Sequence, residues 1–132
     1  MGQEKLNRVN EEVVKAVGAF GGGIASTGKV CGALLGGVAV ISSIYSRGNV
    51  DEKEDPLMWR LGYRLTKKFE ELTHVHGSVN CQDIAQVNWR DRNAVKGFYT
   101  RPEGRRKVCL QLVGDVAFAL GELLEQEVSS PK

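Results

Sequence analysis

The sequence has only three cysteines and three prolines among its 132 residues, and no two of the cysteines share a CxxC spacing. Without paired cysteines or an export signal, we expect no structural disulfide framework. No CxxCH occurs either, which argues against a covalently attached c-type haem.

The chain also lacks a long apolar run and a strong charge of either sign. Its longest apolar stretch, Val30 to Ile44, is interrupted by glycines and serines and is too short to span a bilayer. The segment Met1 to Leu6 has no apolar core of the kind found in secretory signals. A net charge of +2 gives little attraction to nucleic acid. We therefore predict a cytoplasmic protein with no membrane span and no nucleic-acid partner.

What is present suits one ordinary globular domain over residues 1–132. Hydrophobic residues make up 42% of the chain and charged residues 26%, a balance typical of soluble domains. This length leaves room for one core and for no second independent unit. A homo-oligomer is compatible with these features.

Hydrophobic residues recur at helical steps throughout the chain, and no segment alternates like a strand. The pattern predicts helices from Leu6 to Phe20, from about Val30, from Asp55–Pro56 to about Thr73, from Cys81 to about Trp89, and from Arg105 to Val128. Residues 90–107 show the weakest pattern. We predict an all-α fold, a compact bundle of about five helices.

Glycines mark a turn and a close approach. Gly21, Gly22 and Gly23 end the first predicted helix, because successive glycines are costly inside a helix and tolerate positive φ. Gly32 and Gly36 lie four residues apart on the second helix, where small residues let another backbone or a bound group come near. We predict that both face such a neighbour.

Two local motifs give only weak indications of a nucleotide site and of a metal site. Gly23 to Lys29 fits GxxxxGK, but Val30 follows where a nucleotide site needs Ser or Thr, so a glycine-rich turn is the favoured interpretation. His74 and His76, followed by Cys81, are secondary candidates for a metal site, although two histidines in a polar loop are more often simply solvated.

Aromatic and basic residues are mixed between Trp89 and Arg106, as they are in single-strand binders. The favoured alternative is a helix connection in which Trp89, Phe98 and Tyr99 pack inward. Its arginines would then pair with the acidic C-terminal helix, which carries Asp115, Glu122, Glu125 and Glu127.

The three cysteines, Cys31, Cys81 and Cys109, lie near predicted helix starts, and basic residues stand close to Cys31 and Cys109. Both features stabilise thiolates, the form that attacks disulfides and binds metals. One interpretation is that the three meet in one redox or metal site, most closely Cys81 with Cys109, although nothing in their spacing marks such a site. The alternative is three unrelated buried thiols that act as small hydrophobic residues.

A family resemblance supports the shared site. The segment from Ala19 through Gly23 to Gly37, with CGAxxG from Cys31 to Gly36, resembles the redox-active proteins named for the pattern C_GCAxxG_C_C. Residues 77–84, around Cys81, and 109–114, from Cys109, are similar to the family's third and fourth cysteine segments. The resemblance runs from about Glu12 to Leu124, but the family's first cysteine is absent.

The resemblance implies a redox or metal-binding role for Cys31, Cys81 and Cys109, with a redox partner that the sequence does not identify. The related split-Soret cytochromes carry the same cysteine pattern, for which an iron–sulfur cluster has been proposed. The cofactor implied is therefore an iron–sulfur cluster or another thiolate-bound metal, although a cluster usually takes four protein ligands. The alternative function is a structural or interaction module whose cysteine site is degenerate. The sequence offers no defined catalytic constellation for an enzyme.

Overall fold

The computed structural model describes residues 2–5, 7 and 9–129, and this part of the chain is helical with no β-strand. Its α-helices are α1 (Gly2–Lys5), α2 (Glu11–Ala16), α3 (Gly32–Tyr45), α4 (Leu57–Thr73), α5 (Cys81–Ala85), α6 (Arg92–Thr100) and α7 (Arg106–Ser129), with 3₁₀ helices η1 (Gly18–Phe20) and η2 (His74–His76). The all-α prediction is confirmed. None of the described helices combines the length and the apolarity that a bilayer span requires.

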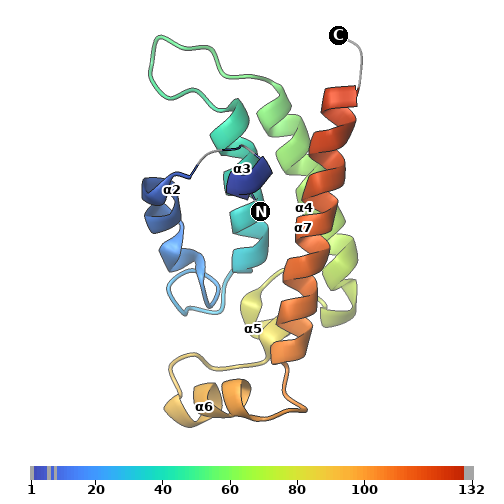
Figure 1. Cartoon of the computed structure of the whole chain (residues 1–132). Helices are drawn as coiled ribbons and strands as arrows, with labels where there is room; N and C mark the ends of the chain where they lie inside the picture. The colour runs from blue at the N-terminus through green and yellow to red at the C-terminus, as the bar shows by residue number, and fades with distance from the viewer. Residues whose placement is uncertain (1, 6, 8, 130–132) are drawn as a thin grey trace.

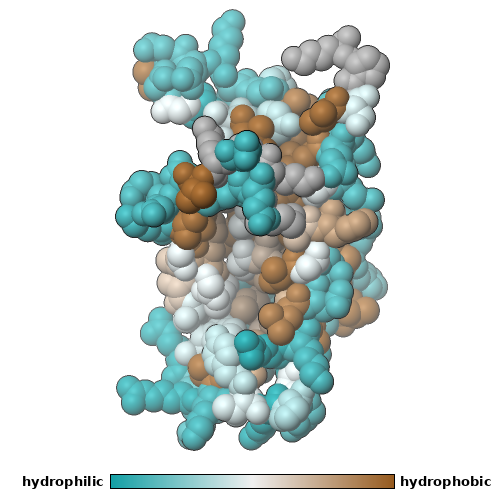
Figure 2. All heavy atoms as spheres, viewed as in Figure 1, coloured by the Kyte–Doolittle hydropathy of each residue, from teal (hydrophilic) through white to brown (hydrophobic). Residues whose placement is uncertain are grey.

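Three long helices, α3, α4 and α7, form the body of the molecule. Figure 1 shows α4 and α7 side by side, with α5 and α6 at one end. Helices α2 and α3 both contact η1. Ile41, Leu61 and Phe69 are completely buried between the three helices, together with Leu112 and Leu120 of α7. Polar residues cover the two ends of the molecule, and apolar residues reach the surface between them (Figure 2).

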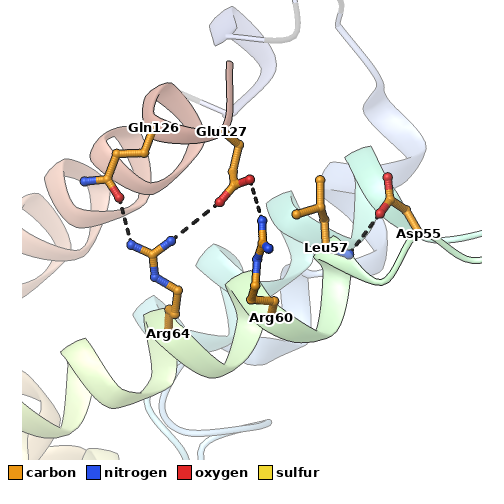
Figure 3. Close-up of polar contacts among 6 residues, drawn as sticks. All are labelled: Asp55, Leu57, Arg60, Arg64, Gln126 and Glu127. Carbon is orange, nitrogen blue, oxygen red and sulfur yellow. Dashed lines mark hydrogen bonds and ion pairs between the residues drawn. The ribbon is translucent and has the colours of Figure 1, made fainter. Parts of the chain in front are cut away.

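Two arginines of α4 form ion pairs and a hydrogen bond with the C-terminal end of α7. Arg60 Nη2 lies 2.6 Å from Glu127 Oε2, and Arg64 bonds both Glu127 and Gln126 (Figure 3). At the start of α4, the Leu57 amide donates to Asp55 Oδ1 at 2.9 Å, so the predicted Asp55–Pro56 helix start is confirmed.

The single predicted helix from Leu6 to Phe20 is wrong. Asn10 interrupts it, because its side chain accepts from the Val13 amide and caps a new helix, α2. That helix buries no residue, so its apolar periodicity reflects no contact with the core. Leu6 lies outside the described residues.

Two other boundaries differ from the sequence prediction. Helix α5 ends at Ala85, since Gln86 adopts a left-handed φ of 52°. The weakly patterned segment 90–107 contains α6, which Asp91 caps by accepting from the Asn93 and Ala94 amides. A capping residue rather than periodicity was the signal for that helix.

The prediction that Gly36 faces a close neighbour is also wrong. A Cβ at Gly36 would meet nothing within 4 Å, whereas a Cβ at Gly37 would lie 2.7 Å from Leu65 Cδ2 and 3.4 Å from Val116 Cγ1. The helical twist turns Gly37, one residue later, toward the core. Gly32 does make a close approach, because its Cβ would lie 2.8 Å from the Phe20 carbonyl oxygen.

Replacing Gly37 with valine should lower the free energy of unfolding by about 1–3 kcal/mol through overpacking against Leu65. Gly36→Ala is the matched control on the same helix, and it should raise that free energy by about 0.5–1 kcal/mol through helix propensity. Urea unfolding of both variants measures the difference. Equal midpoints would contradict this packing.

Candidate functional site

Backbone pairing holds Cys31 and Cys81 next to each other. Residues 28–31 and 79–82 run antiparallel around a single bridge between Val30 and Asn80. The Cys31 amide donates to the Val79 carbonyl at 3.0 Å, and the Cys81 amide donates to the Lys29 carbonyl at 2.7 Å. The two cysteines therefore leave this bridge at the starts of α3 and α5.

A left-handed turn precedes the bridge. Five successive residues from Gly22 to Ser26 have φ between 50° and 68°. This conformation is unfavourable for Ile24, Ala25 and Ser26, at roughly 1–2 kcal/mol per residue. Hydrogen bonds across the turn hold it, including Thr27 Oγ1 to the Gly23 carbonyl at 2.7 Å.

Gly23 is the point where this turn meets the cysteine site. A Cβ on Gly23 would lie 2.6 Å from Cys81 Cβ and would overlap the Lys29 carbonyl oxygen. Only glycine fits here, both for space and for its φ of 68°. By contrast, Gly21 has a φ of −57° and open space around it.

The glycine turn does not form a phosphate cradle. The amides of residues 24–29 all donate to carbonyl groups of the chain itself. In a P-loop, such amides instead point at the phosphates. The geometry therefore agrees with the glycine-turn interpretation of GxxxxGK.

Cys81 sits in a small apolar cluster of its own. It is 8% exposed and packs with Ala85 and Phe98, against which Trp89 and Cys109 also lie. The indole Nε1 of Trp89 donates to Cys81 Sγ at 3.3 Å. Trp89 is held in turn by an edge contact with Phe98, with ring centroids 5.1 Å apart.

Cys31 and Cys109 approach Cys81 from the starts of α3 and α7. Cys31 precedes α3 and packs against the main core, while Cys109 lies in the first turn of α7 against the Cys81 cluster. The three thiols are near enough for their charges to interact. All three cysteines are free thiols.

Burial keeps two of these thiols protonated. Burial, and then the charges that Cys81 and Cys31 would carry, raise the pKa of Cys109 to about 11 against a smaller opposing effect of Arg105. Burial also raises the pKa of Cys31, outweighing the amides of Ala33 and Leu34. The expectation that helix starts make Cys31 and Cys109 thiolates is therefore wrong, because desolvation is the larger effect.

Alkylation of Cys109 by iodoacetamide should be slow at neutral pH and should accelerate as pH approaches about 11. The unfolded chain loses this proton first, near 9.0, so the free energy of unfolding should fall between the two values. Mass spectrometry of timed samples measures the alkylation, with denatured protein as the control. Alkylation of the folded protein at the denatured rate would contradict this assignment.

The two histidines do not join the thiols. His74 is exposed, and His76 Nδ1 lies 3.2 Å from Arg105 Nη2. Arg105 also donates twice to the Ile84 carbonyl, at 2.7 and 3.2 Å. Within the described ranges, no group of three or more His, Cys, Asp or Glu side chains is placed to hold a metal ion. As folded, the donor set does not fit an iron–sulfur cluster, which usually takes four ligands.

The aromatic and basic segment divides between core and surface. Trp89 and Phe98 pack inward beside Cys81, as predicted, but Tyr99 is 56% exposed. Glu127 pairs with Arg60 and Arg64 of α4, so the predicted pairing of this segment with Glu127 is wrong. The sequence alone did not predict that Trp89 bonds Cys81 or that Arg105 bonds the Ile84 carbonyl, and only these contacts place the two residues at the site.

Comparison with protein families identifies the family of this chain. The profile described as "Putative redox-active protein (C_GCAxxG_C_C)" matches residues 1–123. The chain belongs to this family. The match spans the glycine turn and all three cysteines. Searches of curated proteins and of solved structures give no significant match.

Proposed function

We propose that this member of the C_GCAxxG_C_C family is a thiol–disulfide redox protein in which Cys81 pairs with Cys109. The observation that supports it is the placement of three free thiols around Cys81: Cys109 packs against the Cys81 cluster, and backbone pairing holds Cys31 next to Cys81. Cys31 is the alternative partner, because the bridge at Val30 holds it beside Cys81.

The reaction proposed is a two-electron exchange. A disulfide of the partner accepts two electrons, Cys81 and Cys109 lose their protons and form an S–S bond, and the partner leaves as two thiols. The Trp89 N–H, aimed at Cys81 Sγ, can stabilise negative charge that develops on this sulfur. Cys81 is accordingly the proposed attacking thiol.

The raised pKa values bear on the direction of transfer. Dithiols with stabilised thiolates form strong oxidants, because their reduced form is favoured. Here burial disfavours the thiolates of Cys31 and Cys109, so the disulfide form is comparatively stable. We expect the protein to act as a reductant of its partner.

Thiolate-bound metal is the second candidate. The negative charges on Cys31, Cys81 and Cys109 would repel one another, and a cation would offset that repulsion. The three sulfurs would have to move together, and a ligand from outside this set would complete a four-ligand site.

Counting thiols in the purified protein tests the proposal. After mild oxidation, the denatured protein should show one reactive thiol, and after reduction it should show three. Thiols that appear only after a chelator is added, together with bound iron or zinc, would favour the metal candidate instead. Three thiols that resist both oxidation and metal loading would favour the non-catalytic interaction module.

A further inference from the structure

A cavity lies beside the cysteine site, on the side of the left-handed turn. Its volume is about 470 Å³, within the range of small-molecule sites. Residues 26–28 of the turn form part of its wall, and the rest includes Gln82, Gln86, Asn88, Trp89 and Arg90.

The chemistry of the wall is polar and weakly basic. Two carboxamides, Gln82 and Gln86, and the guanidinium of Arg90 make no hydrogen bond or ion pair within the described part of the chain. No Asp or Glu is among the described lining residues. A carboxylate-bearing ligand would thus meet a cation and amide groups without facing a like charge.

On the turn side of the cavity, side chains and not backbone amides would recognise such a ligand. The amides of residues 26–28 already donate within the turn, so the turn offers no nest of free N–H groups to a phosphate. Uncommitted carboxamides suit the amide groups of a short peptide, since each can donate and accept.

Trp89 connects the cavity to the thiols. Its side chain lines the cavity, and its indole N–H bonds Cys81 Sγ. A ligand in the cavity therefore lies against the residue that touches the proposed attacking sulfur. Within the wall, Gly28 packs against Gln82, since a Cβ there would lie 3.0 Å from Gln82 Cβ.

We infer that this cavity binds a small, peptide-like thiol or disulfide that carries carboxylates, with Arg90 as its charge partner. The inference rests on the proposed thiol–disulfide function for the sulfur in the ligand. The binding itself depends only on the cavity. The ligand would be the low-molecular-weight partner of Cys81.

Binding is tested with a probe that cannot exchange disulfides. S-methylglutathione, titrated into the reduced full chain, should shift the NMR signals of Gly28, Gln82 and the Trp89 indole. Its diethyl ester, which lacks the carboxylate charges, should bind at least about tenfold more weakly. Absence of these shifts at millimolar probe, or equal binding of acid and ester, would overturn the inference.

Arg90→Gln is the decisive variant, and Arg92→Gln is its matched control. Arg92 is an exposed arginine two residues away that does not line the cavity. Arg90→Gln should weaken the probe about tenfold while Arg92→Gln leaves it unchanged. Equal effects of the two variants would show a general charge effect and no site.

The two proposals fail in different ways. Reduction of glutathione disulfide should slow in Arg90→Gln, whereas reduction of the neutral bis(2-hydroxyethyl) disulfide should not. Reduction of both disulfides at unchanged rates in Arg90→Gln would overturn the proposal that the cavity binds the ligand, but not the proposed redox function. Probe binding without reduction of either disulfide would overturn the proposed redox function, but not the proposal that the cavity binds such a ligand.

Discussion

Replacing Gly23 with alanine should lower the free energy of unfolding by about 2–5 kcal/mol, the largest stability change expected of a single methyl group in this chain. Two effects add. The φ of 68° is strained for alanine, and the new Cβ would lie 2.6 Å from Cys81 Cβ. Neither neighbour can retreat easily, since Cys81 is buried and the Lys29 carbonyl is backbone already bonded to the Cys81 amide.

Gly21→Ala is the control for this variant. It lies two residues earlier in the same glycine run, with a φ of −57° and no atom within 4 Å of a new Cβ. Its stability should change by no more than about 0.5 kcal/mol. Urea unfolding of both variants gives the comparison. An unchanged urea midpoint for Gly23→Ala would show that the turn is not packed against Cys81 as described.

Replacing Cys81 with serine should abolish the proposed intramolecular disulfide altogether. Cys81 is the thiol that interacts with both others, so its loss leaves Cys31 and Cys109 without the shared partner proposed for them. The Cys81→Ser variant should therefore no longer reduce a partner disulfide. Mass spectrometry of oxidised, alkylated protein under non-reducing conditions measures the bond.

Cys31→Ser and Cys109→Ser show which of these two thiols pairs with Cys81. If the pair is Cys81 with Cys109, Cys31→Ser should keep the disulfide and Cys109→Ser should lose it. The reverse result would assign the pair to Cys31. A disulfide that persists in Cys81→Ser would contradict the central role given to this sulfur.

Helices were predictable where apolar periodicity coincided with real burial. The pattern that begins at Asp55–Pro56 gave α4, because Leu61, Leu65 and Phe69 do face the core. The equally regular pattern before Gly21 failed, because Asn10 caps a new helix there and α2 has no core to face. Periodicity reports which residues share a face but not whether anything covers that face.

The glycines show the same limit. A run of three glycines predicted a turn, and Gly22 and Gly23 take the positive φ that it requires. The continuation of the left-handed conformation through Ile24, Ala25 and Ser26 was not predictable, because branched and larger residues avoid it unless surrounding contacts impose it.

The sequence by itself determined the all-helical class, the glycine turn and the family to which the chain belongs, because periodicity and motif spacing are local properties. The tertiary structure alone decided that Trp89 bonds Cys81 and that Gly37 rather than Gly36 meets the core. It also decided that burial, and not the position at a helix start, sets the direction in which the pKa values of Cys31 and Cys109 shift. Desolvation and packing depend on segments far apart in the chain, and only the fold brings those segments together.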